Sequence, residues 1–327
     1  MIETTPAVPR RRRKLALSLR GLMALILVVG GVLGWQARRA SLQRRSVAAI
    51  ERLGGAVGYD WQVGDMMLPS FVVPTSPPGP AWLRRIVGDE YFQRVTMVIL
   101  PDPQRMPDPS SPGDGLMEYE RILKAIADDG LACLDGLDAD RIDSLQLMNL
   151  PPGPGSLDRL ARCRGLKSLW VLGDVGPETL ARLGEFPGLE DLTISAPLAT
   201  GANLAFVDRL PGLRDLAIAG AKLTDADLGR LCRLRHLESL RAEGPDVTDA
   251  GLALLERLPD LKTVALAGTP VSEEGLAALL KIPKLTRLSI PTDLICQPEL
   301  DAIKAARPTL TIQKKGPSPV PASPDAP

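Results

Sequence analysis

The sequence has very few of the side chains from which most catalytic and metal sites are built. Its 327 residues include a single histidine, His236. One histidine cannot supply a multi-histidine metal site, and we find no histidine-based triad or histidine–cysteine dyad. Because His236 directly precedes Leu237, which the pattern described below places in the core, we expect His236 to be a solvent-exposed residue.

Cysteine is also scarce, and no Cys-x-x-Cys pair occurs. Three of the four cysteines fall inside the repeats described below; the four are Cys133, Cys163, Cys232 and Cys296. Scattered spacing of this kind is typical of small core side chains and not of zinc ligands or a disulfide framework. We therefore expect thiols that serve packing.

Other motifs that bind metal or phosphate are missing as well. One acidic cluster precedes the repeats, but its spacing does not fit a calcium-binding EF-hand and it lacks the closing glutamate. We expect exposed turn carboxylates at its members, Asp135, Asp138, Asp140 and Asp143. The Gly-Pro-Gly of residues 153–155 is not followed by Lys and Ser or Thr, and no Gly-x-Ser-x-Gly is present. The sequence thus predicts no metal, no cofactor and no enzyme.

The chain has no formal net charge, but its charges are unevenly distributed. Lysine and arginine total 39, as do aspartate and glutamate. Residues 1–60 hold 11 basic and 3 acidic side chains, a net charge of +8, so the remainder carries −8. The acidic remainder has the wrong sign for nucleic-acid phosphate, and the basic residues flank an apolar run. We therefore expect no nucleic-acid partner.

The dominant feature that the chain does have is a repeat over residues 142–312. An apolar-x-x-apolar-x-apolar pattern recurs with first positions 23 or 24 residues apart. Its alternating second half predicts a short strand in each unit. The units begin at Ile142-Leu145-Leu147, Leu166-Leu169-Val171, Leu189-Leu192-Ile194, Leu213-Leu216-Ile218, Leu237-Leu240-Ala242, Leu261-Val264-Leu266 and Leu285-Leu288-Ile290.

The rest of each unit has the apolar spacing of a helix. Thr224, Thr248 and Ser272 each precede an acidic residue, so the hydroxyl should cap a helix whose positive dipole end the acid meets. Because one unit cannot bury its own apolar face, the units should stack and pair their strands into a parallel sheet, with a last strand at 310–312. The helices are marked by Leu180, Leu204, Leu228, Leu252, Leu276 and Leu300.

The turn Val247-Thr248-Asp249-Ala250-Gly251-Leu252 resembles that of bacterial membrane-anchored leucine-rich repeat proteins. The resemblance implies an α/β solenoid with parallel strands on the concave face, helices on the convex face, and binding of another protein. One position departs from the family, which usually places Asn, Thr or Cys eight residues after the first leucine. Here we expect packing and strand pairing to hold the turns, because that position holds Leu150, Asp174, Pro197, Ala221, Pro245, Thr269 and Asp293.

An apolar run at residues 15–35, broken only by Arg20, follows a basic tail at 1–14. As a helix rising about 1.5 Å per residue, the run is long enough to span a bilayer. We expect an uncleaved transmembrane helix; the alternative is a signal peptide cleaved near Gly34. Gly30 and Gly34 form a small-xxx-small pair that would allow two such helices to dimerise.

The remaining segments follow from composition. Residues 36–61 predict a basic, amphipathic juxtamembrane helix on anionic headgroups. This run also resembles the juxtamembrane start of membrane-anchored bacterial repeat proteins, through Gly34-Trp35, the arginine pairs Arg38-Arg39 and Arg44-Arg45, Ile50, Leu53-Gly54-Gly55 and Tyr59-Asp60. Residues 62–80 are predicted to be a linker, and 81–141 an N-terminal cap with an insertion loop at 101–115; most of the chain's aromatic residues lie in this cap or upstream of it. Residues 313–327 predict a disordered tail.

Side chains between the buried strand positions should point to the concave side. Among these, Trp170 is aromatic, Asp191 and Asp215 lie beside it, and Arg241 follows. An aromatic anchor next to charges has the composition that dominates binding energy at interfaces. We expect these four residues to contact a partner; alternatively, Trp170 packs against the cap.

The sequence therefore predicts a single-pass membrane protein whose solenoid binds a protein partner. The alternative is a structural spacer or envelope scaffold without a tight-binding partner. The five adjacent basic residues of 10–14 favour a cytoplasmic N-terminus with the repeats on the other side of the membrane.

Overall fold

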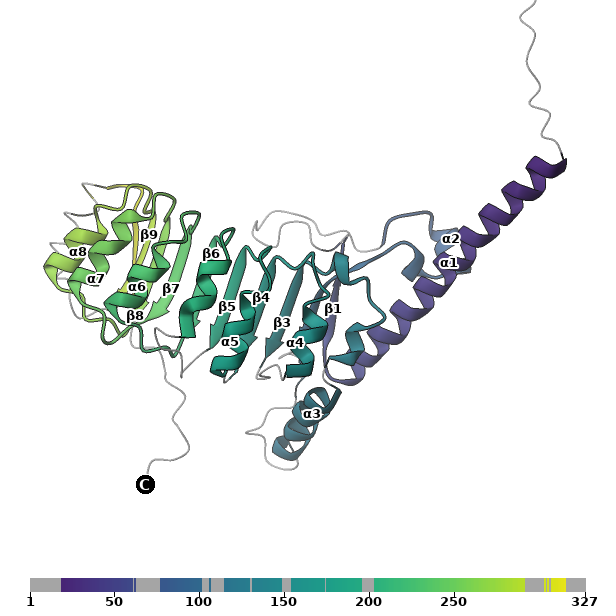
Figure 1. Ribbon diagram of the computed structural model, residues 1–327, viewed down its shortest axis with the longest axis horizontal. Coiled ribbons are helices and arrows are strands. Elements are labelled where there is room, and N and C mark those ends of the chain that lie inside the picture. The colour runs from purple at the N-terminus through teal and green to yellow at the C-terminus, as the bar shows by residue number, and fades with distance from the viewer. Residues whose placement is uncertain are drawn as a thin grey trace, which may run out of the picture.

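The computed structural model describes residues 19–60, 62, 77–101, 106, 115–129, 131–148, 154–173, 175–195, 203–291, 303, 305 and 307–315. One ten-stranded sheet runs through them in chain order (Figure 1). β1 is antiparallel to β2, and the later neighbours are parallel. The strands are Ala56–Tyr59 (β1), Val95–Leu100 (β2), Ser144–Met148 (β3), Ser168–Leu172 (β4), Asp191–Ser195 (β5), Asp215–Ala219 (β6), Ser239–Glu243 (β7), Thr263–Ala267 (β8), Arg287–Pro291 (β9) and Thr311–Lys315 (β10).

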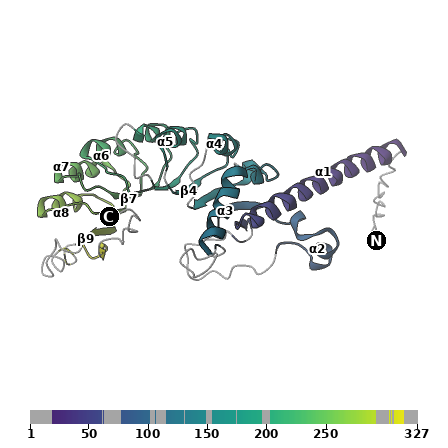
Figure 2. The ribbon, with the colours of Figure 1, turned by 90° about the horizontal axis from the view of Figure 1, so that it is seen from below.

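Helices cover one face of the sheet. Figure 2 shows α4 to α8 along the outer, convex side of the arc, with the strands on the inner side. The α-helices are Leu19–Arg52 (α1), Ala81–Val87 (α2), Gly115–Asp129 (α3), Pro154–Leu160 (α4), Pro177–Leu183 (α5), Asp225–Leu231 (α6), Asp249–Leu254 (α7) and Glu273–Leu279 (α8). The 3-10 helices are Asp89–Tyr91 (η1), Ala132–Leu134 (η2), Ala139–Arg141 (η3), Asn203–Arg209 (η4) and Leu255–Arg257 (η5).

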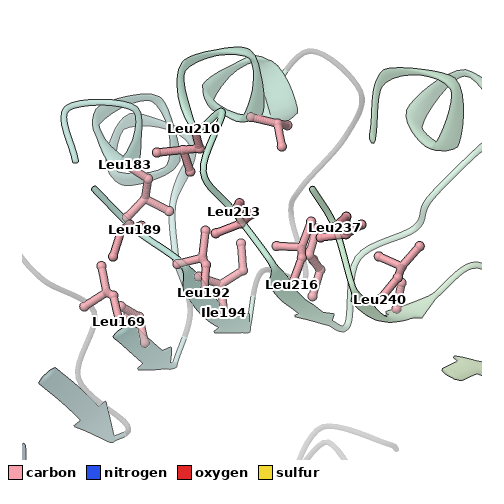
Figure 3. Packing of buried hydrophobic residues seen from close by; sticks show 14 of the residues in the cluster. Leu169, Leu183, Leu189, Leu192, Ile194, Leu210, Leu213, Leu216, Leu237 and Leu240 are labelled. Carbon is pink, nitrogen blue, oxygen red and sulfur yellow. The ribbon is translucent and has the colours of Figure 1, made fainter. Parts of the chain in front are cut away.

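The leucines of the repeat form one continuous core between the sheet and the helices. Buried and half-buried residues alternate along β3, β4, β5 and β8. The strand register places Leu192 between Leu169 and Leu216, and all three are at most 1 % exposed. Figure 3 shows these side chains lying between the strands and the helical layer, together with Leu189 and Leu213. The predicted α/β solenoid is confirmed.

The residue that precedes each strand joins two units through its backbone. The carbonyl oxygen of Lys167 accepts hydrogen bonds from the N–H groups of Glu190 at 2.8 Å and Asp191 at 2.9 Å. These bonds satisfy polar groups that the parallel ladder would otherwise leave unpaired at the strand start. The same pair of bonds recurs at the carbonyls of Glu190, Arg214, Glu238 and Lys262.

The side chains of these five residues alternate in charge along the edge of the solenoid. Lys167 lies 3.6 Å from Glu190, and Glu238 pairs with Arg214 at 2.7 Å and with Lys262 at 2.5 Å. The hydrogen bond from Lys262, and then that from Arg214, lowers the pKa of Glu238. Exposed pairs contribute only about 0.2–1 kcal/mol each. These ion pairs therefore contribute little to the stability of the fold.

The position where related repeats carry a ladder of polar side chains is apolar or unpaired here. Ala221 is 1 % exposed and Pro245 is exposed, so neither offers a side-chain oxygen. Thr269 is 1 % exposed, but its hydroxyl has no hydrogen-bond partner. The polar ladder is broken at these three positions, although Thr269 carries a hydroxyl that could have taken part in it; the other four positions lie outside the described residues.

A different polar ladder links the helical halves of successive units. Asp225 accepts hydrogen bonds from the backbone N–H and the hydroxyl of Thr248 in the next unit, at 2.8 and 2.6 Å. Asp249 accepts the same two bonds from Ser272, at 3.3 and 2.6 Å. A Cβ at Gly251 would lie 2.1 Å from an Asp225 oxygen. The aspartate of one unit thus requires the glycine of the next, and these hydrogen bonds add to the packing and strand pairing that were expected to hold the turns.

All three predicted helix starts are capped, two by the hydroxyl as predicted and the one at Thr224 by a capping box with Asp227. The Thr248 hydroxyl accepts from Ala250 N–H at 3.3 Å, and the Ser272 hydroxyl accepts from Glu274 N–H at 3.1 Å. At Thr224 the backbone N–H donates to the Asp227 carboxylate at 2.8 Å. Each cap occupies a donor or acceptor that a short helix leaves unpaired at its first turn.

One unit differs from the helical prediction. The segment marked by Leu204 forms the 3-10 helix η4 and not an α-helix. Its sequence lacks an acidic residue after Thr200, and it buries Phe206 and Val207 at 2 % exposure each. Aromatic and β-branched side chains have lower helix propensity, so filling the core decides the local geometry.

α1 is one continuous helix of 34 residues, so the predicted segments 15–35 and 36–61 are not separated by a break. Ala40, Ser46 and Ile50 are buried. Ile50 belongs to the same core cluster as the repeat leucines, and Val47 and Leu53 pack against that cluster. The apolar side of the second half of α1 therefore covers protein, and the expectation that it lies along lipid headgroups is corrected.

The N-terminal cap includes more of the chain than residues 81–141. β1 pairs with β2, and α1 is fixed to the cap at several points. Arg44 forms an ion pair with Glu90 at 2.9 Å, and the Ser46 hydroxyl accepts a hydrogen bond from Gly136 N–H at 3.1 Å. A Cβ at Gly136 would lie 2.5 Å from that hydroxyl, so only glycine allows this approach. α1 and β1 together close the first edge of the solenoid.

The far end follows the prediction with one change. The last strand, β10, pairs with β9 and runs through Lys315, so the predicted tail at 313–327 begins inside a strand. Leu300, Cys296, residues 316–327, and most of the predicted linker and insertion loop lie outside the described residues.

Candidate interaction surface

The concave face consists of the strand side chains that point away from the helices. We define the concave patch as Trp170 on β4, Asp191 on β5, Asp215 on β6 and Arg241 on β7. These are four neighbouring strands of the sheet, so the repeat brings the predicted residues onto one surface. Arg241 is exposed, and the other three are partly exposed.

The indole ring of Trp170 is held by a carboxylate on the neighbouring strand. Its Nε1–H donates to Asp191 Oδ2 at 3.0 Å, and the Ser168 hydroxyl donates to the same oxygen at 2.9 Å. Trp170 lies opposite Gln146 and Thr193 in the register and is not part of the core cluster. Two hydrogen bonds to a charged acceptor fix both side chains before any partner arrives.

Two carboxylates of the concave patch face each other directly. Asp191 and Asp215 are register partners on β5 and β6. Burial raises the pKa of Asp215, and the charge of Asp191 raises it further, whereas a hydrogen bond from Ser239 and the charge of Arg241 act in the opposite direction. Like charges directly opposite one another destabilise a sheet. The free protein therefore maintains an acidic surface at a cost in stability.

The neighbouring part of the concave face is apolar, which sequence reasoning missed. Met97 and Ile99 on β2, Met148 on β3 and Leu172 on β4 are partly exposed. The register joins them, because Met97 and Ile99 lie opposite Ser144 and Gln146, and Met148 lies opposite Leu172. The apolar residues at the concave positions 97, 99, 148 and 172 could have predicted this apolar part from the sequence. Trp170 lies between this apolar part and the carboxylates of Asp191 and Asp215.

Comparison with solved structures found two internalins and a leucine-rich repeat protein. Internalin C2 of Listeria monocytogenes is 18 % identical, with a TM-score of 0.40 over 54 % of this chain and 71 % of its own. A leucine-rich repeat protein of Leptospira interrogans is 17 % identical, with a TM-score of 0.37 over 53 % and 43 %. Internalin F of Listeria monocytogenes is 18 % identical, with a TM-score of 0.36 over 57 % and 64 %. A scan of protein-family models and a search of curated proteins found no match.

The leucine repeat of 23 or 24 residues, the sheet in chain order and the helices on its convex side together make the fold a leucine-rich repeat solenoid. Solenoids present extended concave surfaces, built by the small rotation between successive units, and use them for binding. The coarse expectation of an interaction module agrees with this architecture.

The scarce chemical side chains are placed as predicted where the structure describes them. His236 is exposed and lies 3.9 Å from Asp260. Cys133 and Cys163 are buried, and Cys232 donates from Sγ to the Leu254 carbonyl at 3.1 Å. Burial raises the pKa of Cys163 and of Cys232 to about 11, so both thiols are protonated at neutral pH. Among the described residues, no three His, Cys, Asp or Glu side chains gather as a metal site would require.

The acidic cluster before the repeats pairs with arginines. Asp138 forms an ion pair with Arg39 of α1, and Asp135 lies 3.5 Å from Arg159 and 3.4 Å from Arg162. These carboxylates therefore attach α1 and the first unit to the cap. The prediction of exposed turn carboxylates without a metal role did not include this structural use.

Within the described residues, α1 alone has the length and hydropathy needed to cross a membrane, and its most apolar window is not buried in the protein. The length and composition of such a helix near the N-terminus fit a membrane span or a signal sequence. A Cβ at Gly30 or Gly34 would meet nothing within 4 Å, so both glycines lie on an open helix surface.

Proposed function

We propose that this protein is a non-catalytic, membrane-anchored leucine-rich repeat protein that binds another protein through the concave patch. The observation that carries the proposal is the position of Trp170. Its ring is fixed by Asp191 at the border between apolar side chains and paired carboxylates. Preorganised aromatic anchors beside charges contribute most of the binding energy at interfaces.

The chemistry of the concave patch defines the partner segment that fits it. Met148 and Leu172 offer apolar contact on one side of Trp170, and Asp191 and Asp215 offer negative charge on the other. A partner segment with an apolar side chain next to a lysine or arginine would match both. Its cation would also relieve the repulsion between the two carboxylates, which gives binding a favourable term absent from the free protein.

We further propose that α1 remains attached and spans the membrane. The helix is continuous through Gly34 and Trp35, where a signal peptide would be cleaved, and Arg39 stacks on the Trp35 ring with 5.5 Å between the guanidinium carbon and the ring centroid. The basic residues 10–14 favour a cytoplasmic N-terminus, with the repeats on the opposite side. Dimerisation through Gly30 and Gly34 stays a prediction.

The second candidate function is a structural spacer or envelope scaffold. The observation in its favour is that β6 and β8 present only Ala217 and Ala265 at the centre of the concave face. Small side chains offer a partner little contact area. A spacer would therefore bind nothing tightly on either face.

Site-specific photo-crosslinking in the native membrane separates the two functions. A benzophenone amino acid replaces Leu172 beside the concave patch or, in a matched chain, the exposed Ala226 on the convex side. Concave binding predicts a protein adduct from position 172 and none from position 226. A spacer predicts no adduct from either position, and an adduct from 226 alone moves the binding surface to the helices.

The captured protein is then purified and titrated against variants of the concave patch. Trp170→Ala should weaken its binding about 30-fold, or about 2 kcal/mol, with little change in melting temperature. Arg287→Ala, on the same face at β9, is the matched control and should bind normally. Equal affinity of the Trp170→Ala and parent chains would remove Trp170 as the anchor.

A further inference from the structure

α2 carries its largest apolar side chains on the outside. Trp82 is 65 % exposed and Ile86 is 73 % exposed, whereas Leu83 and Val87 are partly buried. Residues four apart lie on the same side of a helix, so Trp82 and Ile86 form one apolar stripe. Outside the first half of α1, the other exposed large apolar side chains in the described residues are Met117 at 66 % and Leu42 at 40 %.

The position of α2 relative to α1 is the second observation. Figures 1 and 2 both place α2 beside the middle of α1, where the apolar first half of that helix ends. η1, which directly follows α2, borders a hollow of about 140 Å³ together with Trp35 and Gln36. α2 is thus at the level where a membrane-spanning α1 would leave the bilayer.

Polar contacts hold α2 at this level. Arg84 of α2 pairs with Asp89 of η1 at 3.3 Å, and Glu90 pairs with Arg44 of α1 at 2.9 Å. Gln43 Nε2 also donates to the Gln93 carbonyl at 3.2 Å. Because several bonds join the two helices through η1, the apolar stripe of α2 keeps a fixed height along α1.

We propose that α2 lies on the bilayer surface, with Trp82 and Ile86 inserted at the boundary between headgroups and acyl chains. The inference rests on the proposed membrane anchoring of α1. Tryptophan is enriched at that boundary because its ring is apolar and its N–H is polar. Arg85 and Arg38 are exposed near the same level, which suits anionic headgroups. The partner of this surface is therefore the lipid bilayer itself.

The contact gives the protein a second attachment point. A domain held by one helix can tilt and rotate about that helix. With α2 on the surface, the cap meets the membrane on one side only, and the sheet keeps a defined orientation above it. α2 is thus a positioning element for the concave face.

Quenching of Trp82 fluorescence by brominated lipids tests the contact. The full chain is reconstituted in phosphatidylcholine vesicles that contain phosphatidylglycerol, with or without bromine on the acyl chains. Trp35→Phe removes the indole of α1. The difference between Trp35→Phe and Trp35→Phe/Trp82→Phe then isolates the emission of Trp82. That difference should lose about half of its intensity in the brominated vesicles, as expected for a ring at the headgroup boundary.

The matched control places a tryptophan at an equally exposed apolar position away from the membrane. Met117 is 66 % exposed on α3, which both views place near the far end of α1. The emission that Met117→Trp adds to the Trp35→Phe/Trp82→Phe chain should not be quenched by bromine. Equal quenching at positions 82 and 117 would overturn the proposal, because contact would then not be specific to α2.

Alkaline carbonate washing separates failure of this inference from failure of the anchor. Retention of the chain in the vesicles with an unquenched Trp82 overturns the α2 contact and leaves the anchor intact. Release of the chain by carbonate overturns the anchor and the α2 contact together. Retention with quenching of Trp82 alone supports both.

Discussion

The ladder between helical halves makes one glycine a sensitive test of how the units join. Gly275 of α8 lies against Asp249 of the preceding unit, whose carboxylate accepts from the N–H and hydroxyl of Ser272. A Cβ at Gly275 would lie 2.1 Å from Asp249 Oδ1 and 2.9 Å from Leu252 Cδ1. Gly275→Ala must therefore displace the carboxylate.

The expected cost follows from two opposing effects. Alanine favours a helix over glycine by about 1 kcal/mol. Overpacking of a filled site costs about 1–3 kcal/mol, and a hydrogen bond to a charged group contributes about 1.5–3 kcal/mol when it is kept. We expect Gly275→Ala to lower the free energy of unfolding by about 1–2 kcal/mol, which corresponds to roughly 2–8 °C in melting temperature for a unit of this size.

A glycine in the helix of an earlier unit provides the matched control. A Cβ at Gly229 of α6 would meet only Leu254 Cδ1 at 3.5 Å, which is an ordinary contact. Gly229→Ala should therefore raise the melting temperature, since only the helix preference remains. Thermal unfolding of the full chain in detergent micelles, followed by circular dichroism, measures both variants under one condition.

The double variant isolates the contact with Asp249. Asp249→Ala alone should destabilise the chain by removing the acceptor of Ser272. In that background, Gly275→Ala should no longer cost stability, because only the end of the flexible Leu252 side chain remains close. Equal costs of Gly275→Ala with and without the Asp249 carboxylate would refute the ladder as the reason for glycine at this position.

Two further predictions concern single polar groups. Thr269→Val should raise the free energy of unfolding by about 1 kcal/mol in the same thermal assay, because the buried Thr269 hydroxyl has no partner; a loss of stability would mean that this hydroxyl is satisfied. The pKa of Asp215 is higher in the folded protein than the value of 3.8 expected in the unfolded chain. Between these two pKa values the folded state keeps a proton on Asp215 that the unfolded state has lost, so the free energy of unfolding falls as the pH rises from 3.8 through the folded pKa. Asp215→Asn should therefore stabilise the chain at neutral pH by about 0.2–1 kcal/mol and give no gain below pH 3.8, where both states of Asp215 are protonated; a gain that is independent of pH would contradict charge repulsion as the cause.

The strands, their register and the core could be predicted because one constraint sets all three. A leucine such as Leu216 must be buried, and the same requirement returns every 23 or 24 residues. Stacking then places equivalent positions side by side, which is why Trp170, Asp191, Asp215 and Arg241 lie on neighbouring strands. Periodicity alone fixes which face a side chain occupies.

Contacts between units could not be predicted in the same way. Asp249 follows Thr248 at a helix start, and an acid at that position fits its own helix dipole equally well. Its partner Ser272 is set by the offset between neighbouring helices, which no single unit encodes. The occurrence of a glycine, Gly275, one unit after Asp249 was the sequence feature that could have revealed this contact.

The second half of α1 was misread for a related reason. Arginines around Val47 and Ile50 resemble a headgroup-binding helix, and the sequence does not reveal that Ser46 meets Gly136, 90 positions away. The apolar side chains in the first half of this helix are exposed, whereas those on one side of its second half are buried against the core. Only the tertiary contacts of the cap mark the change.

The strand order gives the two proposed surfaces a fixed relation to each other. β2 lies in the cap next to β1, which directly follows α1 in the chain, and β4 follows β2 by two strands. At about 4.8 Å between strands, Trp170 is only about 10 Å along the sheet from the cap. If α1 spans the bilayer and α2 rests on it, the apolar part of the concave face is its membrane-proximal part, and the carboxylates of β5 and β6 lie further out. A partner bound at Trp170 would then be held close to the membrane, so a membrane-attached partner would meet this surface at a raised effective concentration.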